Sequence, residues 1–89
     1  MDRLGAKRLE KIIKGVSNHW RIRVLFLLGN KPGLSLDEIN EELGASYKTM
    51  AEHTKRLEVA GLIKKNYVGR TVVHKTTKLG IDILTFLRM

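Results

Sequence analysis

The sequence contains no cysteine, so it can form neither a disulfide framework nor a metal site built on thiolates. It also lacks a run of apolar residues long enough to span a bilayer. The charged N-terminal segment has neither the apolar block nor the small-residue cleavage site of a secretory signal. These absences predict a cytoplasmic protein that does not act at a membrane.

Signs of catalysis are missing as well. The sequence has no nucleophile motif, no Gly-rich phosphate loop and no paired-carboxylate pattern. The acidic pairs Asp37–Glu38 and Glu41–Glu42 are better explained as partners of a helix dipole and a solvated helix face. His19, His53 and His74 are dispersed, whereas a metal site needs at least three converging ligands. We therefore predict no enzyme, no cofactor and no metal site.

Charge is abundant and unevenly distributed. The 89 residues carry 17 basic and 9 acidic side chains, a net charge of +8. Segments 1–31 and 46–78 are strongly basic, while segment 32–45 carries four acids and no base. A basic surface attracts polyanions, although it can also serve solubility alone. The apolar content of 43% is enough for one folded domain, which we place at 1–89.

The spacing of apolar residues predicts five helices and a hairpin. Helical periodicity covers 4–16, 20–28, 36–43, 47–60 and 78–89. Residues 62–68 and 70–76 are rich in Val, Ile, Thr and Tyr with a glycine between them, and predict two strands; 34–35 can add a short third one. The expected fold class is therefore α+β, mostly α, with five helices and a two- to three-stranded β wing.

Local capping signals place the helix ends. Ser35 and Glu38 have the spacing of a capping box, and Ser46 and Thr77 offer side-chain oxygens at the starts of two later helices. Gly44 and Gly61 stand where helices end. The order is helix, turn, helix, wing, and the second helix and the wing of that order are the devices that a small basic domain inserts into DNA grooves.

Five segments in order resemble the winged-helix transcription regulators of the ArsR type, with some likeness to the MarR type. The matching segments are 17–28 (SNHWRIRVLFLL), 43–46 (LGAS), 53–63 (with AGLI at its end), Gly69–Arg70 and 77–84 (beginning TKLG). The resemblance covers nearly the whole chain and implies that helix 47–60 lies in the major groove. It does not extend to metal sensing, because Ser35 and Asp37 stand where the metal sensors carry cysteines.

The first turn of helix 47–60 presents the candidates for reading bases. Hydrogen-bonding side chains gather there, and a good base contact is worth about 1–3 kcal/mol. Two of them have alternative interpretations. Tyr47 either stacks on the sugar-phosphate backbone of DNA or merely covers the turn. Glu52 either accepts a hydrogen bond from a cytosine amino group or forms an ion pair with Lys48 or Arg56. The base-reading candidates are Ser46, Tyr47, Lys48, Thr49 and Glu52.

A second group of residues is predicted to contact phosphates without reading sequence. The lysines of this group have no obvious acidic partner in the sequence. Arg70, at the hairpin tip, either enters a narrow minor groove or is a solvated turn residue, and His53 packs near the turn or binds a phosphate. The phosphate and wing candidates are His53, Lys55, Lys64, Lys65, Arg70 and Lys75.

The last helix is apolar around well more than half of its circumference, which is wider than one core-facing stripe requires. A homodimer would bury the excess and set two recognition helices about 34 Å apart. The predicted dimer residues are Leu9, Ile13, Phe26, Ile81, Leu84 and Leu87.

The predicted function is therefore a sequence-specific, double-stranded DNA-binding transcription regulator, a repressor that binds a pseudo-palindrome as a homodimer. The alternative is a winged-helix module for protein interaction, or for binding nucleic acid without sequence preference. The sequence identifies no small-molecule effector.

Overall fold

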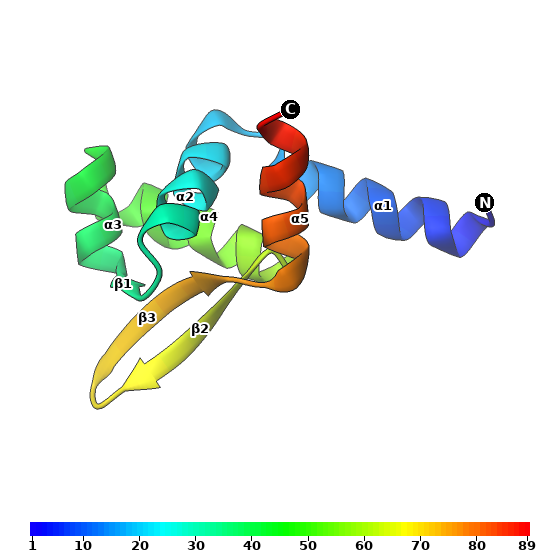
Figure 1. Cartoon of the computed structure of the whole chain (residues 1–89). Coiled ribbons are helices and arrows are strands. Elements are labelled where there is room, and N and C mark those ends of the chain that lie inside the picture. The colour runs from blue at the N-terminus through cyan, green and yellow to red at the C-terminus, as the bar shows by residue number, and fades with distance from the viewer.

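The computed structural model describes all 89 residues and confirms the predicted fold class (Figure 1). Its elements are α1 (Arg3–Val16), α2 (His19–Asn30), β1 (Leu34–Ser35), α3 (Leu36–Leu43), α4 (Tyr47–Val59), β2 (Ile63–Val68), β3 (Thr71–Thr76) and α5 (Lys78–Leu87). Most of the helices surround one core, while α1 projects to one side and the β2–β3 hairpin extends away from the body. None of the helices has the length and apolarity needed to cross a membrane.

The predicted capping residues begin their helices. The Ser35 hydroxyl accepts from the Glu38 amide at 3.2 Å, and the Glu38 carboxylate accepts from the Ser35 amide at 2.9 Å, which completes the capping box of α3. These two bonds lower the pKa of Glu38. Thr77 caps α5 by accepting from the Gly80 amide at 3.1 Å. At the other end of α3, Gly44 adopts the left-handed backbone, with φ of 72°, that lets the chain turn toward α4.

The three strands form an antiparallel sheet in the order β1-β3-β2. The hairpin register runs from Ile63 opposite Thr76 to Val68 opposite Thr71. At its base, His74 is buried and its Nδ1 lies 2.9 Å from the Leu34 carbonyl, which it can only meet as a donor. This bond and the β1 pairing attach the base of the wing to the connection between α2 and α3, and leave its tip extended into solvent (Figure 1).

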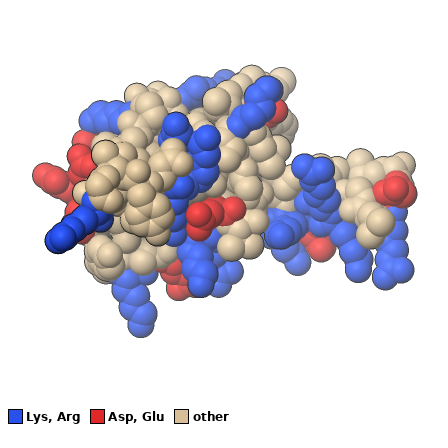
Figure 2. All heavy atoms as spheres, turned by 90° about the horizontal axis from the view of Figure 1, so that it is seen from below, with Lys and Arg blue, Asp and Glu red and all other residues tan.

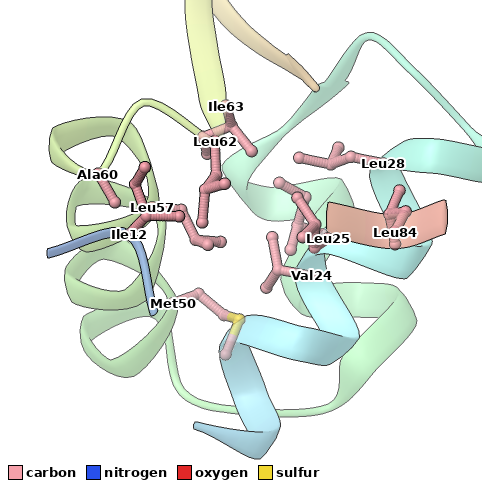
Figure 3. Close-up of a cluster of buried hydrophobic side chains, with 11 residues drawn as sticks. Ile12, Val24, Leu25, Leu28, Met50, Leu57, Ala60, Leu62, Ile63 and Leu84 are labelled. Atoms are coloured by element: carbon pink, nitrogen blue, oxygen red, sulfur yellow. The ribbon is translucent and has the colours of Figure 1, made fainter. Parts of the chain in front are cut away.

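Eleven buried apolar residues form the core (Figure 3). Helix α2 supplies Val24, Leu25 and Leu28, none of which has any exposed surface. Met50 and Leu57 come from the inner face of α4, as their spacing predicts. Full burial of one such side chain contributes about 1.5–3 kcal/mol. The core therefore fixes α4 by one face and leaves its opposite face outside.

Leu84 corrects the predicted dimer interface. It lies in the core of its own chain and is only 2% exposed. The physical reason is the absence of a side chain at Gly29, where a Cβ would stand 2.6 Å from the Leu84 Cδ1. The glycine lets α5 approach α2 closely enough to bury Leu84.

Candidate nucleic-acid interface

The leading turn of α4 faces solvent. Tyr47 and Lys48 are exposed, and Lys48 has no ion-pair partner. The hydroxyls of Ser46 and Thr49 are already joined: Ser46 Oγ accepts from the Thr49 amide at 3.1 Å and donates to Thr49 Oγ1 at 2.7 Å. Four of the five predicted base-reading side chains thus stand together on one turn, which the core holds in place from behind.

Glu52, the fifth candidate, forms an ion pair with Arg56, which was the alternative to base reading. Its carboxylate accepts from Arg56 Nη2 at 3.0 Å and from Arg56 Nε at 3.2 Å. The hydrogen bond from Arg56 is the main cause of the lowered pKa of Glu52, and the charge of Arg56 adds to it. Glu52 is therefore ionised and already paired on the outer surface of the helix.

The residues predicted to contact phosphates differ in exposure and in whether they already form an ion pair. Lys55, Lys64 and Arg70 are exposed and have no ion-pair partner, and Lys75 is half-buried on β3 without one. The expectation that Lys65 lacks an acidic partner is wrong, because its Nζ lies 3.4 Å from the Glu58 carboxylate. The tight turn after α4 brings the start of β2 back beside the last turn of the helix.

For His53 the structure shows an arrangement that the sequence did not predict. Its Nδ1 lies 3.1 Å from Nη1 of Arg21 on α2. Because a guanidinium can only donate, the imidazole must accept at Nδ1 and is neutral in this contact. Burial first, and the charge of Arg21 second, lower the pKa of His53. The Nδ1 atom of this half-buried ring is thus engaged within the chain.

Arg21 also reaches the end of α1. Its Nε donates to the Gly15 carbonyl at 2.7 Å and its Nη2 to the Lys14 carbonyl at 3.3 Å. One side chain therefore joins two carbonyls at the end of α1 to helix α4. Sequence reasoning missed this residue, because no local pattern connects Arg21 with a histidine 32 positions later.

An open cleft of about 680 Å³ lies between α1 and α4. Cationic side chains outnumber acidic ones in its lining, which consists of Glu10, Lys11, Lys14, Gly15, Arg21, Glu52, Lys55, Arg56, Val59 and Ala60. We name it the α1–α4 cleft. Its α4 wall runs from Glu52 to Val59, toward the C-terminal end of the helix. The sequence gives no sign of the cleft, because α1 and α4 are brought together only by the fold.

The charge pattern agrees with this geometry. Seen from below, Lys and Arg side chains lie across the body and along the projecting α1, while acidic side chains form one group toward the side where α3 lies and are otherwise scattered over the body and α1 (Figure 2). The structure contains no group of three or more His, Cys, Asp or Glu residues arranged to hold a metal ion.

The remaining predicted dimer residues are divided in exposure. Ile13 and Ile81 are 60% and 50% exposed, and Leu9 is also on the surface. Phe26 and Leu87 are half-buried, and the guanidinium of Arg88 lies over the Phe26 ring, 5.2 Å from its centroid. Leu4 and Phe86, which the sequence reasoning did not select, are more exposed than any of these.

Several solved structures share this fold. The homodimeric winged helix-turn-helix domain of Mb0332 from Mycobacterium bovis, described as a possible ArsR-family regulator, has a TM-score of 0.87 and 18% identity over 99% of this chain and 83% of that one. NolR from Sinorhizobium fredii has a TM-score of 0.84 and 17% identity, covering 93% and 83%. HlyU from Vibrio cholerae has a TM-score of 0.84 and 22% identity, covering 98% and 94%. These likenesses confirm the ArsR-type resemblance for the fold.

The search of curated proteins found no match. The family model described as winged helix-turn-helix DNA-binding matches residues 18–64. The match begins at the cap of α2, includes the whole of α3 and α4, and ends in β2, so it contains the exposed leading turn. It covers more than half of the sequence, and the chain therefore belongs to the winged helix-turn-helix DNA-binding family.

Proposed function

We propose that the protein is a sequence-specific transcription regulator that binds a pseudo-palindromic duplex as a homodimer and represses by occlusion. The observation that carries the proposal is the exposed leading turn of α4. Burial of Met50, Thr54 and Leu57 fixes the helix from behind, so Tyr47 and Lys48 stand outward on a rigid support. A helix held in this way can enter the major groove without rearranging the core.

Base reading belongs to the leading turn in this proposal. Lys48 is unpaired and can donate to guanine, while Thr49 and Tyr47 present hydroxyls to the same region. Glu52 stays paired with Arg56 unless a cytosine amino group replaces that partner. Sequence preference thus depends first on Lys48 and its immediate neighbours.

The wing and the lysines around it fix the register of the protein on DNA. Lys55, Lys64, Lys65 and Lys75 contact phosphates, and Lys65 exchanges Glu58 for one of them. Arg70, next to Gly69 at the hairpin tip, reaches the minor groove. The lysine contacts strengthen binding to every sequence alike.

Dimer formation covers the apolar surface left on the two terminal helices, within one domain that spans residues 1–89. Leu9 and Ile13 of α1 and Ile81 of α5 are the exposed members, with Phe26 and Leu87 at the edge. The solved Mb0332 domain, which shares the fold, is described as homodimeric. A twofold partner would place two copies of α4 about one DNA turn apart. Sedimentation should show a dimer at micromolar concentrations, and a persistent monomer would contradict this part of the proposal.

Selection of genomic fragments on the purified protein tests the function. An enriched inverted repeat supports the proposal, whereas one uniform affinity for all duplexes supports sequence-independent nucleic-acid binding. No affinity for DNA at all supports a protein-interaction module. Salt dependence alone cannot separate the first two outcomes, because phosphate contacts produce a steep slope in both.

Two sets of substitutions separate reading from positioning. Lys48→Ala should change which bases are preferred, because a base contact is lost. Replacing Lys64 and Lys65 together by Ala should weaken binding to the selected repeat and to unrelated duplexes by the same factor. If the double variant changes sequence preference and Lys48→Ala does not, the assignment of these roles is reversed.

A further inference from the structure

Helix α1 has two opposite faces of different character. At about 100° per residue, Leu9, Ile12, Ile13 and Val16 share one side of the helix. Cations repeat at intervals of four, four and three residues on the other side, and we call this set the α1 stripe: Arg3, Lys7, Lys11 and Lys14. The helix therefore carries a continuous positive edge opposite its apolar one.

The cations of the α1 stripe form almost no ion pairs within the chain. Arg3, Lys7 and Lys11 have no ion-pair partner, and Lys14 has only an exposed contact of 3.8 Å with Glu10 on its own helix. Of the whole helix, only Ile12 is buried, and the N-terminal half projects beyond the body (Figure 1). A row of free cations on a projecting helix is well placed to contact a long polyanion.

The inner end of the stripe joins the predicted DNA surface. Lys11 and Lys14 line the α1–α4 cleft, and Lys55 of α4 lines it from the other side. Lys55 lies eight residues beyond Tyr47, which is about 12 Å along a helix that rises 1.5 Å per residue. The major groove is also about 12 Å wide. With the leading turn in the groove, Lys55 and the cleft beside it therefore reach the edge where phosphates run.

The position of α1 beside α4 is fixed. The Arg21 bonds to the Lys14 and Gly15 carbonyls and to His53 tie the end of the stripe to the recognition helix. A DNA backbone that enters the α1–α4 cleft would consequently contact Lys11 and Lys14, and these lysines would keep a constant position relative to the bases that α4 reads. The Val59 side chain in the cleft offers the sugars an apolar contact.

We propose that the α1 stripe, together with Lys55, is a second phosphate-contact surface that binds the DNA backbone between the two half-sites. The inference rests on the function proposed above. Dimer formation through Leu9 and Ile13 would use the opposite face of α1, so it would place the helix near the twofold axis and leave the stripe uncovered. The surface adds affinity without reading sequence, because its donors are lysines and an arginine aimed at phosphates.

The test compares wild type with the triple variant Lys7→Ala, Lys11→Ala and Lys14→Ala on the duplex enriched by selection. Affinity is measured over a range of salt concentrations, and hydroxyl-radical footprints are recorded for both proteins. Each lost phosphate contact should reduce the slope of log affinity against log salt by about 0.9. We expect a slope shallower by about 2–3, unchanged base preference, and loss of backbone protection between the half-sites.

A matched control is available on the same helix. Arg8 is exposed but lies off the stripe, so Arg8→Ala removes one charge from α1 without removing a predicted contact. Lys11→Ala should lower the salt slope and Arg8→Ala should leave it almost unchanged. Sedimentation and circular dichroism on all variants confirm that the dimer and the helix content are retained. Equal effects of the two single substitutions would overturn the proposal, since net charge would then explain both.

Two other results would also overturn it. If the triple variant keeps the wild-type slope and footprint while the Lys64 and Lys65 double variant loses slope, DNA binding stands and this inference alone fails. If the triple variant loses affinity for vesicles of phosphatidylglycerol but not for DNA, the stripe serves a membrane surface. Wild-type protein that binds no duplex at all would remove the proposed function and this inference together.

Discussion

Helices α1 and α2 are adjacent in sequence but differ in how many of their residues are buried. α2, with 12 residues, buries Val24, Leu25 and Leu28 completely. α1 is longer, with 14 residues, yet buries only Ile12. Helix α2 is apolar nearly all round because other elements cover it on several sides, whereas α1 has one apolar face that its own chain covers only near the C-terminal end. The stability of the fold therefore depends more on α2 than on α1, whose apolar face is left largely exposed.

The largest expected effect separates the two helices directly. Leu25→Ala should reduce the free energy of unfolding by about 2–5 kcal/mol, because it leaves a cavity in the centre of the core. Ile13→Ala should change it by no more than about 0.5 kcal/mol in the monomer, since the side chain is 60% exposed. Urea unfolding at low protein concentration measures both. Comparable losses at the two positions would contradict the division between the helices.

A second contrast lies within α1 itself. At Gly15 an added Cβ would stand 2.4 Å from the Ala60 Cβ, so Gly15→Ala should force α1 away from α4 at a cost of about 1–3 kcal/mol. At Gly5 the nearest atoms belong to the Asp2 side chain, whose Oδ1 caps the helix by accepting from the Gly5 amide, and to the flexible Met1 side chain, at 3.0 Å and 3.3 Å. Gly5→Ala should therefore stabilise the helix by up to about 1 kcal/mol through helix propensity. Thermal unfolding should shift in opposite directions, and a stabilising shift at both positions would show that α1 is not held against α4.

The same contrast explains how far the sequence alone could predict the structure. The caps at Ser35, Ser46 and Thr77 were predicted, because capping needs only a side chain and an amide a few residues later. The inner face of α4 was predicted for a similar reason, since Met50, Thr54 and Leu57 repeat with the helical period. Both kinds of signal are local, so they needed no knowledge of the fold.

The sequence did not show which face of α5 enters the core or which distant side chains form pairs. α5 is apolar around most of its circumference, and periodicity could not show that Gly29 admits Leu84 to the core. The Lys65–Glu58 pair depends on how the chain turns between α4 and β2. The Arg21–His53 contact and the cleft beside it depend on three helices meeting. Helix α1 had an apolar face in the sequence, but what covers that face is not encoded in its spacing.

Acidic pH should weaken the fold through His74, which is buried, and His53, which is half-buried. The pKa values of both His53 and His74 are lowered from 6.5, chiefly by burial, so the folded chain binds fewer protons than the unfolded chain. Their neutral forms contribute fully above 6.5, and stability is lost as the pH falls below that value. Unfolding free energies measured between about pH 7.5 and pH 5.5 should decrease. His74→Gln and His53→Gln should each flatten part of this dependence, and an unchanged profile in both variants would contradict the assignment.

The smallest effect is expected from the charged face of α1. Lys14→Ala removes only an exposed ion pair with Glu10, at 3.8 Å, and should change the free energy of unfolding by less than about 0.5 kcal/mol. Urea unfolding of this variant beside wild type provides the check. A loss as large as that of Gly15→Ala would mean that the lysine supports the fold, and that any effect on DNA affinity arises indirectly.

The hydrogen bond between the Ser46 and Thr49 hydroxyls limits the hydrogen bonds that the first turn of α4 can make with a base. Ser46 has given its only proton to Thr49, so it can offer nothing but a lone pair to an outside group. Thr49 keeps its own proton free, with its oxygen held in place by the serine. Opposite a purine N7 or a carbonyl oxygen that proton finds an acceptor, and opposite a cytosine amino group the second lone pair of the Thr49 oxygen can accept. The side-chain pair that starts the helix therefore leaves Thr49 able to serve both kinds of base edge, whereas Ser46 can only accept.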